Sequence, residues 1–283
     1  MESNQTRQQS GAIHPLAEIA PGAKLGAGVR VGPFCAVGPD VVLHDGVELI
    51  SHVVVTGATT IGSGTRVHPQ AVLGGEPQNL RHKGGRTTLT IGRNCLIREA
   101  ATMHVGSDND RGATSVGDNC MLMAYAHVAH DCVVGNDVVL SHSATLGGHS
   151  EIGDGVIIGG LAAVHQFVRV GHHAFVGGMS AVVGDVIPFG MAVGNRAKLR
   201  GLNVVGLKRS GAKRQELTTL RAAYQMLFDR AKPVVENVGA VREAYGDDAR
   251  VAEVLDFITN RKKRIFCVPP VSEVPQEDEA VLG

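Results

Sequence analysis

Aliphatic residues recur every six positions along most of this chain. The series begins at Ile13, ends at Val182 and has two breaks. Its members are Ile13, Ile19, Leu25, Val31, Val37, Leu43, Leu49, Val55, Ile61, Val67, Leu73, Ile91, Ile97, Met103, Val116, Leu122, Val128, Val134, Leu140, Leu146, Ile152, Ile158, Val164, Val170, Val176 and Val182. A period of six matches neither a helix face, with a period of 3.6, nor an alternating strand, with a period of 2. The pattern predicts short strands joined by tight corners, each strand directing one aliphatic side chain inward.

Three such strands make one triangular coil of about 18 residues, so residues 18 apart lie directly above one another. Stacking through parallel hydrogen bonds at about 4.8 Å per coil gives roughly nine coils and a prism on the order of 40 Å long. Hexapeptide repeats of this kind are typical of parallel β-helices. Glycine often follows the aliphatic residue, as at Gly26 and Gly32, and we expect it there to let the chain turn with positive φ.

Two polar, glycine-bearing segments interrupt the repeat. They are residues 74–90, which contain Pro77, and residues 105–115. Loops inserted in a solenoid tend to project from one face and often carry function. We therefore expect a β-helix domain over residues 12–195 with two projecting loops, both preceding the coil that holds the most notable polar motif.

Beyond the repeat, the apolar period becomes that of a helix. Leu217 and Leu220 fall at helical spacing, and two further helices are predicted over residues 234–245 and 251–264. The fold class is therefore mainly β, a parallel β-helix followed by a small α-helical C-terminal domain over residues 196–266.

The composition fits a thin, repetitive β architecture, because aromatic residues make up only 4% of the chain and tryptophan is absent. Lys+Arg and Asp+Glu both number 27, so the net charge is zero, which argues against a nucleic-acid partner.

The chain has no run of 18 or more apolar residues, so we expect no membrane span. The polar N-terminus lacks the apolar core of a signal peptide and predicts a cytoplasmic location. Residues 1–11 and 267–283 are expected to be disordered.

Four of the five cysteines share one place in the repeat. Cys35, Cys95, Cys120 and Cys132 each lie four residues after an inward aliphatic, a slot that elsewhere holds alanine, threonine or serine. They are therefore expected to be small core residues. Cys267 lies outside the repeat, and no CxxC pair points to a zinc knuckle or disulfide framework.

The stretch AHVAHDC, residues 126–132, concentrates the candidate chemistry. Because Val128 points inward, His130 two residues later should face outward, with Gly148 stacked on it 18 residues on. Asp131 beside it, under His149, could orient the His130 ring and fix its tautomer. An unobstructed Gly148 N–H could bind a developing oxyanion.

Other interpretations of the motif remain open at this point. His127 and His130 could be a metal pair, or polar residues on the outside of a repeat in a chain with 13 histidines. His14, His44, His68 and His104 follow inward aliphatics and are interpreted as glycine replacements at corners. A flat prism face is also a packing face, and a trimer about an axis parallel to the prism would place His130 in a cleft between subunits.

The order of the motifs AHVAHDC, NDVVLSHSATLGGH, GGLAAVHQFVRVG and GNRAKLRGLNVVGLKRSG resembles the UDP-N-acetylglucosamine acyltransferase family of hexapeptide acyltransferases. The resemblance spans about residues 12–265. It implies a left-handed β-helix and a homotrimer with active sites between subunits. It also implies transfer of a 3-hydroxyacyl chain from acyl carrier protein to the 3-position of UDP-N-acetylglucosamine, the first step of lipid A biosynthesis, with no cofactor and no metal.

The resemblance also implies roles for individual residues. His130 corresponds to the general base, Asp131 to its partner and Gly148 to the oxyanion donor. The Gly178 segment resembles the ruler that sets acyl-chain length. The substrate-binding positions are Gln78, Asn79, Arg81, His127, His149, His165, Gln166, Asn203 and Arg209.

Two positions depart from the family pattern. The segment PQNLR, usually PQDLK, has Asn79 in place of aspartate, which loses a charge, and Arg81 in place of lysine. This leaves open an acceptor sugar with an amine at its 3-position.

Three further possibilities concern the class of protein and its partner. A related N-acyltransferase would carry an additional N-terminal sugar-binding domain, for which a repeat starting at Ile13 leaves no room. A zinc-dependent hexapeptide protein of the carbonic anhydrase type would bind its metal through histidines. Basic residues near the start of the helical domain are candidates for docking the acidic acyl carrier protein. They are Arg196, Lys198, Arg200, Lys208, Arg209, Lys213 and Arg214.

Overall fold

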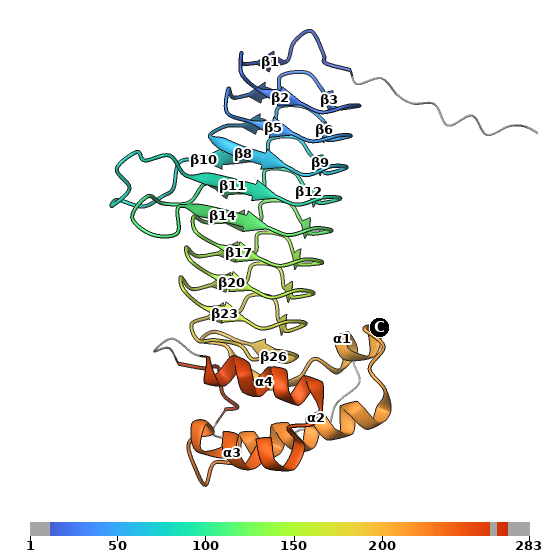
Figure 1. The fold of residues 1–283 in the computed structure, drawn as a ribbon, viewed down its shortest axis with the longest axis vertical. Helices are drawn as coiled ribbons and strands as arrows, with labels where there is room; N and C mark the ends of the chain where they lie inside the picture. The colour runs from blue at the N-terminus through green and yellow to red at the C-terminus, as the bar shows by residue number, and fades with distance from the viewer. Residues whose placement is uncertain (1–11, 261–264, 271–283) are drawn as a thin grey trace, which may run out of the picture.

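The computed structural model describes residues 12–260 and 265–270 of the chain. These residues form a three-sided prism of stacked coils that ends in a group of four helices (Figure 1). The coils wind left-handed, against the usual right-handed rule for parallel crossovers. The predicted left-handed parallel β-helix with a helical C-terminal region is therefore confirmed. The expected disorder of residues 1–11 and 271–283 lies outside the described residues.

Each side of the prism is one sheet of very short strands. The first sheet contains, in spatial order, β1 (Glu18–Ile19), β4 (Ala36–Val37), β7 (Val54–Val55), β10 (Val72–Gly75), β13 (Thr102–His104), β16 (His127–Val128), β19 (Thr145–Leu146), β22 (Ala163–Val164) and β25 (Ala181–Val182). The second contains β2 (Lys24–Leu25), β5 (Val42–Leu43), β8 (Ala58–Ile61), β11 (Thr88–Ile91), β14 (Ala113–Val116), β17 (Val133–Val134), β20 (Glu151–Ile152) and β23 (Arg169–Val170). The third contains β3 (Arg30–Val31), β6 (Glu48–Leu49), β9 (Arg66–Val67), β12 (Leu96–Ile97), β15 (Met121–Leu122), β18 (Val139–Leu140), β21 (Ile157–Ile158), β24 (Phe175–Val176), β26 (Gly190–Val193) and β27 (Lys198–Leu202).

The strand register follows the predicted stacking. His127 pairs with Thr145 and Thr145 with Ala163, each 18 residues on. The sequence spacing between paired residues is larger where the two loops are inserted. Val72 pairs with Thr102, and Thr102 pairs with His127. Figure 1 shows both loops leaving the prism on the same side, beside β10, β11 and β14.

The aliphatic series forms the core of the prism. Every member from Val31 onward is buried, whereas Ile13, Ile19 and Leu25 at the open N-terminal end are only partly covered or exposed. The four repeat cysteines are buried, as expected for core residues.

The glycine that follows the inward aliphatic does not have the role predicted for it. Positive φ occurs two residues later, at corner positions such as Phe34 (φ 58°) and His52 (φ 52°). A Cβ on Gly32 would instead collide with the carbonyl of Ile50 in the next coil. Glycine is needed there because the neighbouring backbone passes too close for any side chain.

The C-terminal region departs from the expected boundaries. The helices are α1 (Val204–Arg209), α2 (Arg214–Leu227), α3 (Val234–Tyr245) and α4 (Ala249–Thr259). The prediction for residues 234–245 is confirmed, and α1 was not predicted. The helix expected to start at 251 starts at Ala249, because the Asp248 side chain accepts N–H groups from Arg250 and Val251 and caps it. Residues 261–264, where it was expected to end, lie outside the described residues.

Two segments near the end of the repeat differ further from the prediction. Strand β27 pairs antiparallel with β26, so the third sheet continues past residue 195. Cys267, assigned to a disordered tail, is buried, and its N–H donates to the carbonyl of Asp185.

Arg169 connects the last coils to helix α4. Its Nε donates to Asp185 Oδ2 at 2.8 Å, and Asp185 is only 1% exposed. The same guanidinium donates to the carbonyls of Phe257 and Asn260 and lies 4.3 Å from the centre of the Phe257 ring. One side chain thus satisfies a buried carboxylate and the C-terminal end of a helix.

Replacing Arg169 by alanine should lower the free energy of unfolding by about 3–5 kcal/mol, because it leaves the Asp185 carboxylate buried without its cation. Urea unfolding followed by circular dichroism would measure the change. The matched control is Arg242→Ala, which removes an exposed ion pair with Asp256 and should cost less than about 1 kcal/mol. Equal losses in the two variants would contradict the assignment.

Candidate active site

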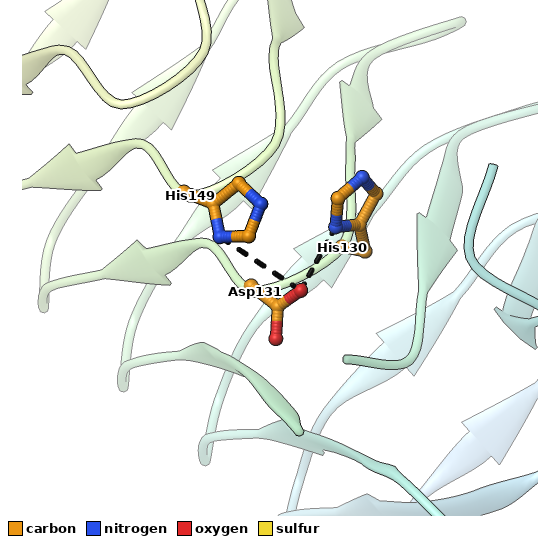
Figure 2. Close-up of side chains that lie close together, drawn as sticks. All are labelled: His130, Asp131 and His149. Carbon is orange, nitrogen blue, oxygen red and sulfur yellow. Dashed lines mark hydrogen bonds and ion pairs between the residues drawn. The ribbon is translucent and has the colours of Figure 1, made fainter. Parts of the chain in front are cut away.

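The central polar cluster lies where two consecutive coils turn the same corner. His130 and Asp131 follow β16, and His149 follows β19 one coil later (Figure 2). Asp131 (φ 60°) and His149 (φ 61°) hold the positive-φ corner position. That position is common to the whole repeat, so the cluster needs no special backbone.

Asp131 is held by the second loop. Its carboxylate accepts N–H groups from Ser107, at 3.1 and 3.0 Å, and from Gly112, at 3.0 Å. Its own N–H donates to Thr114 Oγ1 at 2.8 Å. A carboxylate only accepts hydrogen bonds, so this ring of donors suits it and fixes its orientation. Asp131 is 0% exposed.

His130 bonds to the remaining side of that carboxylate. Its Nδ1 lies 2.8 Å from Asp131 Oδ2, and because the carboxylate accepts, Nδ1 carries the proton. The lone pair is then on Nε2. His130 points out of the prism, as predicted, but it is only 9% exposed. The low exposure was not predicted, because it depends on the second loop, which covers this corner.

Gly148 packs directly against the His130 ring. A Cβ there would lie 2.9 Å from His130 Nε2 and 2.8 Å from Cε1. Gly148 lies two residues after an inward aliphatic, at a position whose backbone N–H is not used by the strand ladder. Proline, which has no N–H, occupies this position at Pro33 and Pro39. At Asn136 the N–H donates to Asp154 Oδ1.

Gly148 has neither of these arrangements. Among the hydrogen bonds of the described residues, none uses its N–H. The structure therefore brings His130, Asp131 and the Gly148 N–H together, as the register predicts.

His149 has a carboxylate partner that the sequence did not indicate. Its Nδ1 lies 2.9 Å from Asp110 Oδ2 in the second loop and 3.9 Å from Asp131 Oδ2. The ring stacks on Phe167 at 4.2 Å and meets His130 edge-on at 4.9 Å. Burial lowers the pKa of His149, while Asp131 and Asp110 oppose that effect.

His127 and His104 form a second pair of histidines beside the cluster. Their ring centres are 5.0 Å apart, and His127 Nδ1 lies 2.7 Å from Thr102 Oγ1. Burial, with His104 and His130 nearby, lowers the pKa of His127 to about 4, so it is neutral at pH 7. His104, interpreted from sequence as a corner replacement, has a buried Nδ1 without a hydrogen-bond partner. Strand β13, which holds His104, pairs with β16, which holds His127, but the loop inserted between them breaks the 18-residue spacing that could have revealed the pair.

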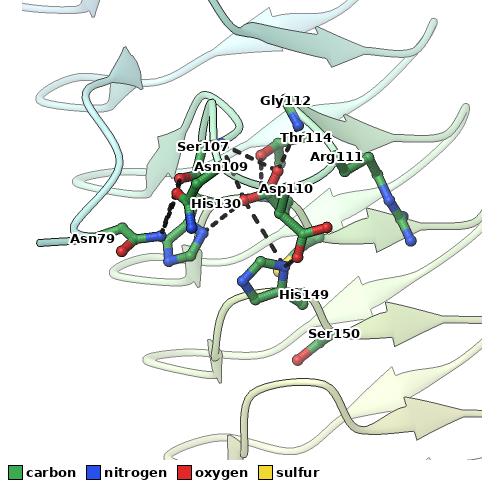
Figure 3. Close-up of polar contacts among 12 residues, drawn as sticks. Asn79, Ser107, Asn109, Asp110, Arg111, Gly112, Thr114, His130, His149 and Ser150 are labelled. Atoms are coloured by element: carbon green, nitrogen blue, oxygen red, sulfur yellow. Dashed lines mark hydrogen bonds and ion pairs between the residues drawn. The ribbon is translucent and has the colours of Figure 1, made fainter. Parts of the chain in front are cut away.

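The first loop is tied to the second through Asn79. Its Nδ2 donates to Ser107 Oγ at 3.0 Å and to Asn109 Oδ1 at 3.3 Å (Figure 3). Its Oδ1 accepts the N–H of Arg81. Both ends of the amide are therefore engaged within the loops. Gln78 and Arg81 are exposed.

The other predicted site residues are spread more widely. Gln166 lies one coil beyond Gly148, and both it and His165 are exposed. Gly178 follows β24 at a different corner, with Gly160 beneath it. Asn203 Oδ1 caps α1 by accepting the Gly206 N–H, and its Nδ2 donates to a backbone carbonyl.

Arg209 is exposed in the last turn of α1. Within the described part of the chain, no hydrogen bond or ion pair joins Gly178, Asn203 or Arg209 to His130.

The potential ligand atoms of His130, Asp131 and His149 all lie within 4.8 Å of one another, so a metal must be considered. Both oxygens of Asp131 already accept N–H groups, and Nδ1 of each histidine faces a carboxylate. A cation between them would displace these donors. The arrangement fits a hydrogen-bonded base better than a metal centre.

Comparison with known proteins agrees with the fold and the motifs. Residues 185–267 match the model of Udp N-acetylglucosamine O-acyltransferase, domain 2, and residues 113–148 match the bacterial transferase hexapeptide model. None of the helices in the described ranges combines the length and apolarity needed to cross a membrane.

Relatives cover nearly the whole chain. An acyl-[acyl-carrier-protein]–UDP-N-acetylglucosamine O-acyltransferase of Mesorhizobium japonicum is 58% identical over 91% of this chain and 92% of its own. The corresponding protein of Brucella ovis is 56% identical over 92% of this chain and 93% of its own. The structure of UDP-N-acetylglucosamine acyltransferase from Campylobacter jejuni superposes with a TM-score of 0.86 at 37% identity, covering 92% of this chain and 100% of that one. The chain therefore belongs to the UDP-N-acetylglucosamine O-acyltransferase family.

Proposed function

We propose that this protein transfers a 3-hydroxyacyl chain from acyl carrier protein to the 3-hydroxyl of UDP-N-acetylglucosamine, the first step of lipid A biosynthesis. The observation that carries the proposal is the His130–Asp131 pair beneath the unpaired Gly148 N–H, in a chain 58% identical to a protein named for this reaction. The same names do not favour a 3-amino sugar or a zinc protein of the carbonic anhydrase type.

His130 is the general base of the proposed reaction. Its Nε2 takes the proton of the sugar hydroxyl as the oxygen attacks the thioester carbon. The resulting imidazolium is stabilised by the Asp131 carboxylate 2.8 Å from Nδ1. Because Asp131 is held by the Ser107 and Gly112 N–H groups, the ring is oriented before the substrate arrives.

The Gly148 N–H is the donor for the oxyanion that forms on the thioester carbonyl. Collapse of the tetrahedral intermediate breaks the carbon–sulfur bond, and the departing thiolate takes the proton back from His130. The transfer is direct and needs no acyl-enzyme. Cys132 is not suited to be a nucleophile: it is 0% exposed, and burial raises the pKa of its thiol to about 12.

We further propose a homotrimer with active sites between subunits. In the single chain Gly178, Asn203 and Arg209 are not joined to His130, which is consistent with a neighbour completing the site. His127, His149, His165 and Gln166 would line the cleft, with Gln78, Asn79 and Arg81 on the loop above it. Gly178 would leave room for the acyl chain.

The acyl carrier protein is proposed to dock on the basic residues around α1 and α2. Lys208 and Arg214 line a cavity of about 450 Å³ between these helices, together with Arg221. An acidic carrier protein complements such a surface. We also propose a cytoplasmic location. The net charge of zero supports the proposal that nucleic acid is not a partner.

The decisive experiment is an assay of the purified protein with acyl carrier proteins of several chain lengths, with UDP-N-acetylglucosamine and its 3-amino analogue as acceptors. We expect transfer to the 3-hydroxyl, no loss on treatment with chelator, and a mass corresponding to a trimer. Transfer to the amine alone, or stoichiometric zinc without transfer, would contradict the proposal.

Replacing Gly148 by alanine should lower kcat by about 10- to 100-fold, because the added Cβ would force the His130 ring away from its position. The φ of Gly148 is not positive, so the fold should tolerate alanine. Steady-state kinetics and thermal unfolding would test both statements. Combined with His130→Ala, the change should cost nothing more, and an additive loss would show that it acts elsewhere.

A further inference from the structure

Asp110 is a half-exposed acid of the second loop that reaches the proposed active site. Its side chain is 49% exposed, yet its Oδ2 lies 2.9 Å from Nδ1 of His149, which is 13% exposed. Figure 3 shows Asp110 over His149, with the neighbouring Arg111 directed away from the histidines.

Two histidines have access to one oxygen of Asp131. His130 Nδ1 lies 2.8 Å from Asp131 Oδ2, and His149 Nδ1 lies 3.9 Å from the same atom. That carboxylate already accepts the Ser107 and Gly112 N–H groups. A second imidazole turning toward it would compete with His130 for the oxygen that orients the base. Asp110 supplies His149 with a carboxylate of its own and removes that competition.

The remaining contacts of His149 fix the plane of its ring. Phe167 stacks on one face at 4.2 Å with an interplanar angle of 2°, and His130 lies edge-on at 88°. These contacts do not determine which way the nitrogens face. The contact with the Asp110 carboxylate does so, because it fixes Nδ1 on the loop side and leaves Nε2 available.

We propose that Asp110 is a positioning residue of the acyltransferase. It acts through His149, holding that ring away from Asp131 so that His130 and Asp131 remain a pair, and keeping His149 Nε2 turned toward the substrate. The inference rests on the proposed function and deepens it.

The groups that face His149 define the electrostatic consequence. Burial lowers the pKa of His149, Asp131 and Asp110 raise it, and His130 and Arg111 lower it further. Removing the charge of Asp110 should therefore lower the pKa of His149, whereas removing Arg111 should leave it unchanged or raise it.

Arg111 also provides a matched control for the loop itself. It pairs with Glu151 at 3.1 Å, which ties the same loop to the coil that holds His149. If Asp110 only fastened the loop, neutralising Arg111 would have the same effect as neutralising Asp110.

The test compares Asp110→Asn with Arg111→Gln. We expect Asp110→Asn to lower kcat about tenfold with little change in KM, and to move the NMR titration midpoint of His149 to lower pH. Arg111→Gln should keep kcat within about twofold and should not lower that midpoint. An equal loss of kcat in both variants would overturn the proposal in favour of a loop fastening.

A second arm uses His149→Gln as the background. There Asp110→Asn should cause no further loss, because the residue through which it acts is gone, and an additive loss would overturn the proposal. Asp110→Glu, which keeps the charge, should recover much of the activity. If the wild-type protein transfers no acyl chain, the proposed function fails, whereas an unshifted His149 midpoint in Asp110→Asn overturns the positioning role alone.

Discussion

Replacing His130 by alanine should lower kcat for acyl transfer by about 10³–10⁴-fold while the prism stays folded. The loss is large because the change removes the proton acceptor itself, and the His130 ring is the group that packs against Gly148. The fold should survive because His130 lies outside the aliphatic core, to which Val128 of the preceding strand β16 contributes.

The control is His44→Ala, which removes an exposed histidine that follows an inward aliphatic far from the site. It should leave kcat within about twofold. Steady-state assays with saturating sugar nucleotide would give kcat, and circular dichroism with light scattering would show whether each variant keeps its fold and mass. A His130→Ala enzyme with more than a tenth of wild-type kcat would exclude His130 as the base.

The repeat made the prism and the centre of the candidate site predictable. A coil of three six-residue steps holds 18 residues, so Gly148 lies over His130 and His149 lies over Asp131. This stacking rule fixes which residues meet wherever no loop is inserted. A register wrong by one residue would have displaced every stacked pair. The observed pairing of His127 with Thr145 therefore tests the predicted register independently.

The loops were not predictable in the same way. Ser107, Asp110 and Gly112 lie in a segment without periodicity, and their positions depend on contacts with the corner that they cover. The repeat therefore predicted neither the hydrogen-bond partners of Asp131 nor the burial of His130 under the second loop. The prediction for Gly32 was wrong for a related reason. Its requirement for glycine comes from the close approach of the Ile50 backbone in the next coil, which is a tertiary contact.

The short elements at the end of the repeat were not predicted, for a different reason. Helix α1 has six residues with Leu207 alone buried, so it carries no amphipathic period that could be recognised. Strand β27 runs antiparallel to β26 and does not continue the hexad. The longer helices α2 and α3 bury several side chains each and show the expected spacing.

Replacing Asp131 by asparagine should lower kcat by about 10²–10³-fold, less than the loss of the base itself. The amide has one acceptor oxygen where the carboxylate has two, and all the present partners of the side chain are donors. If its NH₂ faces His130, Nδ1 must become the acceptor, which moves the ring proton to Nε2 and abolishes the base. If its NH₂ faces Ser107 and Gly112, the second loop loses its attachment.

These two outcomes can be separated, and both differ from a general effect of the substitution. Nitrogen-15 NMR would show a changed His130 tautomer in the first case, and faster hydrogen exchange at the Ser107 and Gly112 amides would show a released loop in the second. Asp137→Asn is the matched control, because Asp137 holds the same corner position with φ 56° and asparagine is tolerated there. It should leave kcat within about twofold. Asp131→Asn with wild-type kcat would mean that the buried carboxylate orients nothing, and that His130 acts without it.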